Sequence, residues 1–143
     1  MKPLDKNNLF TIFQVGDEEV YKEHNLEDTL KNPFVLMGMV LRGLQNYHLM
    51  DLMYTKTYPE EYGEIALTVK RKYYTTLYTY LTRIDSTKFE TIYSIGKSFE
   101  IEEVEEGLNE LLYFFVELEE YERCAVIKRY IDYLCYQEVG VLK

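Results

Sequence analysis

Residues 100–118, EIEEVEEGLNELLYFFVEL, decide the fold class of this chain. Apolar side chains recur there at alternating steps of three and four residues: Ile101, Val104, Leu108, Leu111, Phe115 and Leu118. This spacing places all of them on one stripe of an α-helix. Glutamates crowd the rest of its first half: Glu100, Glu102, Glu103, Glu105, Glu106 and Glu110. The stretch therefore predicts an amphipathic helix with a strongly negative exposed side.

The stripe loses its phase after Leu118, because the next apolar positions step by three and drift off a straight helix face. A tight turn near Glu119-Glu120 explains the drift and predicts an αα-hairpin, with one straight helix over 100–136 as the alternative. In the second arm the expected inward residues are Tyr121, Cys124, Ala125, Ile127, Ile131 and Leu134. The expected outward residues are Glu122, Arg123, Lys128, Arg129 and Asp132.

Asn32-Pro33 marks the start of an earlier helix, since Asn caps free N–H groups and Pro is tolerated at the first helical position. That helix is expected to run to about Tyr54 and to be central to the core, because it is apolar on most faces. Its expected core residues are Phe34, Leu36, Met37, Val40, Leu41, Leu44, Tyr47, His48 and Leu52. Gly38 and Gly43 are expected to let a neighbouring helix approach closely.

Tyr58-Pro59 repeats the start signal and opens a third amphipathic helix, which Asp85-Ser86 ends. Its stripe consists of Tyr62, Ile65, Ala66, Val69, Tyr73, Leu77, Tyr80, Leu81 and Ile84. A brief helix or extended piece follows over 87–95. We expect Gly96 to close that piece as a turn residue and Ser98 to cap the next helix.

Residues 1–32 read as an irregular N-terminal arm in which 9–15 form either a short strand or the start of a helix. We therefore predict an all-α fold, a compact bundle of four to five helices with a C-terminal αα-hairpin. The 143 residues suit a single domain with its helical core over 33–143.

The net charge of −9 is concentrated in residues 96–143, which carry five basic and twelve acidic side chains. This distribution disfavours binding to nucleic-acid phosphates. It fits either another protein with a basic surface or a solvated face that serves only solubility. The first residues lack the pattern expected of a secretory signal, and the sequence holds no apolar run of about 20 residues, so no membrane partner is expected. Cys124 and Cys135 read as buried free thiols, which is consistent with a cytoplasmic location.

No catalytic, cofactor or metal motif withstands inspection. The stretch 94–98, SIGKS, resembles the end of a phosphate-binding loop, but Thr91 stands where that loop needs its first glycine. The ladder Glu102, Glu106 and Glu110 lacks the inward histidine of helical metal sites. His48 and Asp51 are three residues apart and are expected to share a local hydrogen bond. We therefore expect no enzyme, no cofactor and no metal.

The remaining hypothesis is a non-enzymatic protein-binding module, acting as adaptor, regulator or inhibitor of a basic partner. Its candidate contact residues are Glu102, Glu103, Glu105, Glu106, Glu110, Tyr74 and Tyr78. One alternative is a homo-oligomeric assembly component of the kind found in viruses and phages. Another is single-stranded nucleic-acid binding through the basic and aromatic segment 70–78. Two simpler readings stand against the latter: the basic cluster is a solvated face whose tyrosines pack at its rim, or it pairs with the glutamates of the C-terminal helix.

Overall fold

The structure is a computed structural model that describes residues 31–136. Within this range the chain forms five α-helices and no strand, which confirms the predicted all-α bundle. The helices are α2 (Pro33–Thr57), α3 (Pro59–Thr82), α4 (Phe89–Ser98), α5 (Ile101–Glu117) and α6 (Tyr121–Ile131). A π-helical turn, η2 (Asp132–Tyr136), continues α6. The arm predicted over 1–32, with its undecided segment 9–15, lies almost entirely outside the described residues.

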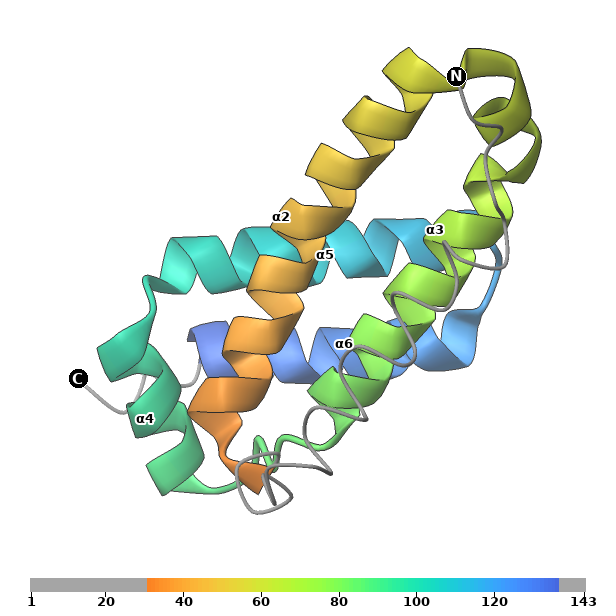
Figure 1. Cartoon of the computed structure of the whole chain (residues 1–143). Helices are drawn as coiled ribbons and strands as arrows, with labels where there is room; N and C mark the ends of the chain where they lie inside the picture. Colours follow the sequence, from red (N-terminus) through yellow and green to blue (C-terminus); the bar gives the residue numbers. More distant parts are fainter. Residues whose placement is uncertain (1–30, 137–143) are drawn as a thin grey trace.

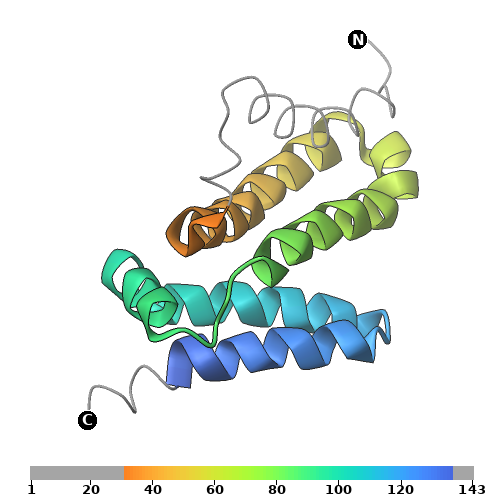
Figure 2. The ribbon, with the colours of Figure 1, turned by 90° about the horizontal axis from the view of Figure 1, so that it is seen from below.

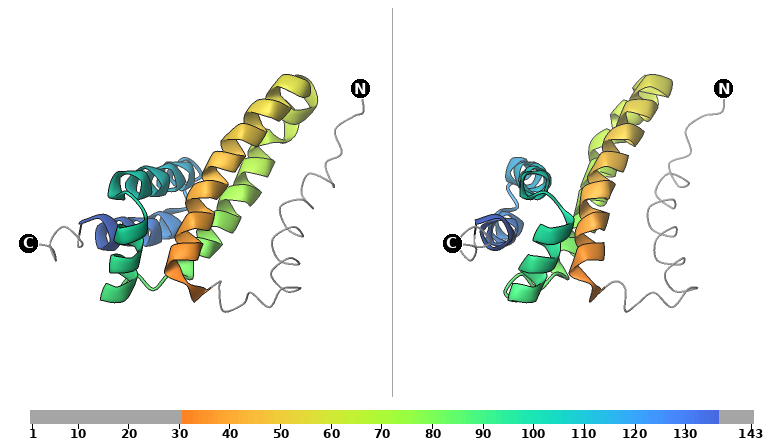
Figure 3. Two further views of the ribbon diagram at one scale, coloured as in Figure 1. Left: turned by 60° about the vertical axis from the view of Figure 1, so that its left-hand side comes forward. Right: turned by 90° about the vertical axis from the view of Figure 1, so that its left-hand side faces the viewer.

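The helices form two crossed layers (Figures 1 and 2). One layer is the antiparallel hairpin α2–α3, and the other is the antiparallel hairpin α5–α6, which runs across it. The helix α4 lies at one end and packs against α2 and η2. Beyond the crossing, the end of α2 and the start of α3 extend past α5, where no other described helix lies against them (Figures 1 and 3).

The predicted helix starts are confirmed. The Asn32 side chain accepts a hydrogen bond of 2.9 Å from the Phe34 N–H, and Pro33 occupies the first turn of α2. This helix continues to Thr57, slightly beyond the expected end. The helix α3 begins at Pro59 with two glutamates in its first turn, where the positive end of the helix dipole favours carboxylates.

The predicted αα-hairpin is also confirmed, and the alternative of one straight helix is wrong. Glu119 adopts a left-handed conformation with φ 59°, which ends α5. The N–H groups of Glu119 and Glu120 donate to the carbonyls of Val116 and Phe115, each at 3.0 Å. These bonds satisfy the last carbonyls of α5 before α6 begins.

The segment before α5 forms a brief helix, one of the two forms predicted for it, but the predictions for its end are wrong. Gly96 is not a turn residue but lies inside α4, which buries Ile92 and Ile95 and continues to Ser98. Because α4 extends this far, Ser98 ends one helix instead of capping the next, and Glu100 takes the N-cap position of α5.

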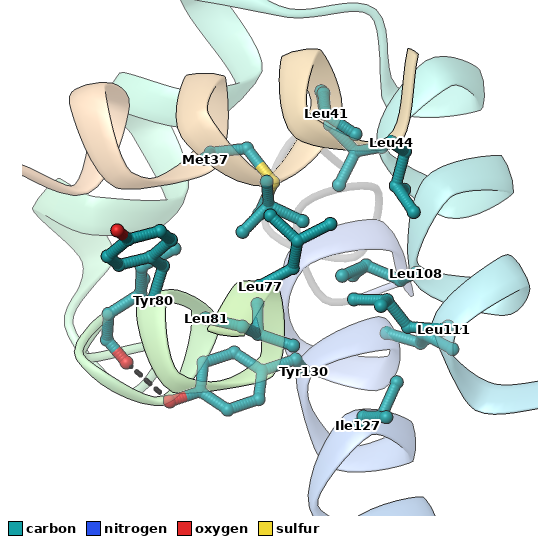
Figure 4. Close-up of a cluster of buried hydrophobic side chains, with 14 of the residues drawn as sticks. Met37, Leu41, Leu44, Leu77, Tyr80, Leu81, Leu108, Leu111, Ile127 and Tyr130 are labelled. Carbon is teal, nitrogen blue, oxygen red and sulfur yellow. Dashed lines mark hydrogen bonds between the residues drawn. The ribbon is translucent and has the colours of Figure 1, made fainter. Parts of the chain in front are cut away.

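The core is built from leucines and other apolar side chains of both hairpins. In Figure 4, Met37, Leu77, Leu108 and Ile127 converge from four different helices. Tyr130 is also buried there and donates a hydrogen bond of 2.7 Å from its hydroxyl to the Ile84 carbonyl. This contact ties α6 to the turn that follows α3.

Two glycines permit close helix contacts. A Cβ at Gly43 would lie 2.4 Å from Leu77 Cδ2, so the predicted close approach at this glycine is confirmed. A Cβ at Gly107 would lie 2.5 Å from Leu41 Cδ2, which brings α5 close to α2. At Gly38 the nearest atom would be 3.6 Å away, an ordinary contact, so the prediction is wrong there.

Several residues predicted to be core are exposed. Phe34, His48 and Leu52 of α2 are exposed, although the Phe34 ring lies 5.3 Å from that of Phe99 and His48 bonds to Glu110 of α5. Tyr121 and Ala125 lie on an outer side of α6, whereas Cys124 and its partners in the stripe are buried. Periodicity thus placed each buried stripe correctly near its centre and less well at its margins.

Candidate protein-binding surface

The outer side of α5 carries an exposed acidic row that ends in an aromatic residue and a further glutamate. Glu102, Glu106, Tyr113 and Glu117 follow one another at steps of four, seven and four residues, which places them on one face of the helix. All four are exposed, and Tyr113 retains 64% of its accessible surface. Buried residues on the opposite side hold the helix in place: Val104, Leu108, Leu111 and Phe115.

Of the five glutamates predicted to contact a partner, Glu102, Glu103 and Glu106 are exposed and Glu105 is half-buried. Glu110 differs from them because it serves the fold. Its Oε2 accepts a hydrogen bond of 2.7 Å from the Tyr74 hydroxyl, and its Oε1 accepts one of 2.7 Å from His48 Nε2. Glu110 therefore connects α5 to both helices of the other layer.

The predicted hydrogen bond between His48 and Asp51 is wrong. His48 reaches across to Glu110, while Asp51 accepts a hydrogen bond of 2.8 Å from the Tyr62 hydroxyl. Burial, and then the bond to Asp51, raises the pKa of Tyr62 well above its ordinary value. Burial, and then the bond to Glu110, raises the pKa of Tyr74 in the same way. Both tyrosines therefore remain neutral hydrogen-bond donors to carboxylates.

The prediction that Tyr74 is available to a partner is wrong. Only 1% of its surface is exposed, because its ring packs edge-on against Tyr47 and Phe114 at centroid distances of 5.1 and 4.8 Å. The sequence stripe of α3 was centred on Tyr73 and Leu77, which face α2 and the core. The neighbouring side of α3 is buried as well, since it packs on the α5–α6 hairpin.

Tyr78 is half-buried on that same side, with its ring 5.7 Å from Phe115 and the Arg123 guanidinium 5.3 Å above it. The basic cluster before it is also engaged internally. The Lys70 ammonium lies over the Tyr74 ring at 5.3 Å, and Arg71 Nη2 donates to Glu120 Oε1 at 2.6 Å. These contacts fit the second of the simpler readings, in which the cluster pairs with the C-terminal glutamates.

The thiols and carboxylates of the described residues form no metal-binding cluster. Cys124 and Cys135 are free and buried as expected, and burial raises the pKa of the Cys124 thiol. Across residues 31–136, no three His, Cys, Asp or Glu side chains come together as a set of metal ligands. The described helices include none that is both long enough and apolar enough to cross a membrane.

Sequence reasoning did not include Tyr113 among the candidate residues, although its position seven residues after Glu106 places it on the acidic side of the helix. The described residues thus define an all-α protein of two crossed helical hairpins with an acidic outer row on α5. The chain matches no protein-family model, and no curated protein or solved structure shows significant similarity to it. The function proposed below rests on the residues of this chain alone.

Proposed function

We propose that the protein is a non-enzymatic binding module that uses the outer side of α5 to bind a basic surface of another protein. The observation that carries this proposal is the exposed row Glu102, Glu106, Tyr113 and Glu117 on a helix fixed by a buried stripe. The glutamates would steer a cationic partner toward the helix, and Tyr113 would supply an aromatic anchor at the centre of the contact. The protein would act as adaptor, regulator or inhibitor.

Helix stability explains only part of this charge. Glu102 and Glu103 lie in the first turn of α5, where carboxylates are favourable beside the positive end of the helix dipole. Glu106 lies beyond that turn. Glu117 is the last residue of α5, where the dipole disfavours an acidic side chain and where this helix has no basic residue. Binding to a basic partner gives a reason for both of these exposed glutamates.

Two further features fit a cytoplasmic location and a protein partner in place of nucleic acid. The buried free thiols suit a reducing compartment, so the proposal includes a cytoplasmic location. Stacking of nucleic-acid bases on 70–78 would need accessible tyrosine rings, and the ring of Tyr74 is buried while that of Tyr78 is half-buried under Arg123.

The test is a pull-down from the native host with the wild-type protein and with the triple variant Glu102→Gln, Glu103→Gln and Glu106→Gln. A matched control removes three glutamates at the start of another helix, with Glu60→Gln, Glu61→Gln and Glu64→Gln in α3. We expect the α5 triple variant to lose a protein partner that the wild type and the control variant retain.

Salt provides the second readout. About 1 M salt shortens the Debye length to about 3 Å, so the same partner should be released at that concentration. A partner that binds the α5 triple variant as well as the wild type, and that resists high salt, would contradict the proposal.

A further inference from the structure

Two exposed leucines lie on the side of the α2–α3 hairpin that faces α5. They lie beyond the part of the hairpin that α5 covers. Leu52 follows His48 by four residues, one turn of α2, and His48 is bonded to Glu110. Leu67 precedes Tyr74 by seven residues, two turns of α3, and Tyr74 is bonded to the same glutamate. Their exposed fractions are 60% and 64%, which is high for leucine.

The same side of α3 remains open beyond Leu67. Gly63 lies one turn earlier, and a Cβ built on it would meet no atom within 4 Å. Figures 1 and 3 show the reason: the ends of α2 and α3 that join at Tyr58 extend past α5, and α6 lies on the far side of α5. No described helix therefore covers Leu52 and Leu67.

The edge of α5 on this side is acidic, and the two cations of α3 that lie between it and Leu67 are already engaged: Lys70 lies over the Phe114 ring and Arg71 donates to Glu120. Glu106, Glu110, Tyr113 and Glu117 follow at steps of four, three and four residues and so share this edge. The position of Glu110 fixes the orientation of the row, since its carboxylate reaches both His48 and Tyr74 of the hairpin. We name the resulting area the overhang surface and define it by its exposed members, Leu52, Leu67, Glu106, Tyr113 and Glu117.

We propose that the overhang surface binds a basic amphipathic helix, laid along α5 with its apolar stripe on Leu52 and Leu67. Lysines or arginines on the edge of that helix would pair with Glu106 and Glu117. This inference rests on the proposed function and names its partner class. An apolar side next to an acidic side is complementary to a helix that is apolar on one stripe and cationic beside it.

The geometry also sets the spacing of the partner's charges. Glu106 and Glu117 are eleven residues apart in one helix, so they are about 16 Å apart along its axis. A partner helix parallel or antiparallel to α5 would need cationic residues about three turns apart, with apolar residues between them. An extended peptide fits less well, because the described residues offer no strand edge with which its backbone could pair.

The probe is a synthetic 18-residue helix of leucine and lysine with this spacing, titrated against the full chain and followed by fluorescence anisotropy. A scrambled peptide of the same composition, which lacks the apolar stripe, controls for charge alone. We expect the striped peptide to bind at least about tenfold more tightly at low salt, since only it can bury both leucines. Equal binding of both peptides, or no binding by the striped one, would overturn the inference.

Variants then locate the site. Leu52→Ser with Leu67→Ser is expected to weaken binding about tenfold or more, and because both side chains are exposed the fold should tolerate the change. The matched control is Phe89→Ser with Tyr93→Ser, which removes two exposed aromatic residues of α4 and should change affinity less than about twofold. Glu106→Gln with Glu117→Gln should weaken binding and flatten its salt dependence.

The two proposals can fail separately. If the leucine variant binds the striped peptide like the wild type, while the Gln variant of residues 102, 103 and 106 still loses its cellular partner, the inference falls and the proposed function stands. If sedimentation shows a dimer that the leucine variant disperses, and the peptide does not bind, the overhang surface is an interface between copies of this chain and the inference is wrong. If no partner and no cationic peptide binds at low salt, both fail.

Discussion

Replacing Gly107 in α5 by alanine is expected to destabilise the protein, although alanine is the better helix former. The added Cβ would lie 2.5 Å from Leu41 Cδ2 and 3.4 Å from Leu44 Cδ1. Non-bonded carbons prefer separations of about 3.5–4.0 Å, so the Leu41 methyl group would have to retreat by about 1 Å or more. Both leucines are buried between α2 and α5, which leaves little room for that movement.

The size of the effect follows from two opposing contributions. Alanine gains about 1 kcal/mol over glycine inside a helix. Overpacking a well-filled core costs about 1–3 kcal/mol. We therefore expect Gly107→Ala to lower the free energy of unfolding by up to about 2 kcal/mol. The matched control is Gly63→Ala, where a Cβ meets no atom within 4 Å and only the gain of about 1 kcal/mol should remain.

Urea unfolding monitored by circular dichroism measures both variants, and the comparison requires unchanged m values. The difference between the two variants isolates the overpacking cost at the α2–α5 contact. Equal stabilisation by both alanines would refute the close approach of these helices. A double-mutant cycle adds a second check. Leu41→Ala alone is expected to lower the free energy of unfolding by about 2–5 kcal/mol. In the Gly107→Ala background it should lower it by less, because the added methyl group occupies part of the cavity.

Three further predictions concern single residues. Glu119→Gly is expected to raise the free energy of unfolding by about 1 kcal/mol, since glycine adopts the left-handed φ of 59° without a side-chain clash, and urea midpoints will test this. Asn32→Ala should lower it by about 1 kcal/mol through loss of the cap on Phe34, measured in the same way. The raised pKa of Tyr74 means that its contribution to stability is complete below the unfolded tyrosine pKa of about 10 and is lost as the pH rises further. Tyr74→Phe should therefore make alkaline unfolding less steep above about pH 10, and an unchanged slope in circular dichroism would contradict the assignment.

The parts of the fold that local rules determine could be read from the sequence. The cap at Asn32 and the proline after it fix the start of α2 whatever the rest of the chain does. The phase break after Leu118 required a turn, because a helix that continued straight would have rotated its apolar residues out of the core. These features depend on a few neighbouring residues, so their prediction did not require knowledge of how the helices pack.

The parts that depend on helix crossing could not be read in this way. A single apolar stripe predicts one buried side, but α3 is buried on two, toward α2 and toward the α5–α6 hairpin, and Tyr74 lies on the second. The opposite error occurred in α2, where Leu52 was predicted to be core and is exposed. Periodicity gives the direction of a buried side, whereas the length that another helix covers is set by the crossing point, here near Gly107.

The same distinction separates the glutamates of α5 and determines how binding experiments should be designed. Glu106 and Glu110 are one turn apart and look alike in the sequence, yet Glu110 holds α2 and α3 through His48 and Tyr74 while Glu106 is exposed. Neutralising Glu110 would remove a charged acceptor from two hydrogen bonds. The part-buried bond from Tyr74 is worth about 1.5–3 kcal/mol, and the exposed bond from His48 is worth less because water screens it. A loss of binding would then have two indistinguishable causes: a movement of the α2–α3 hairpin, or the loss of a direct contact with the partner. A variant set that spares Glu110 and neutralises Glu106 and Glu117 changes the overhang surface while leaving the joint between the two layers intact.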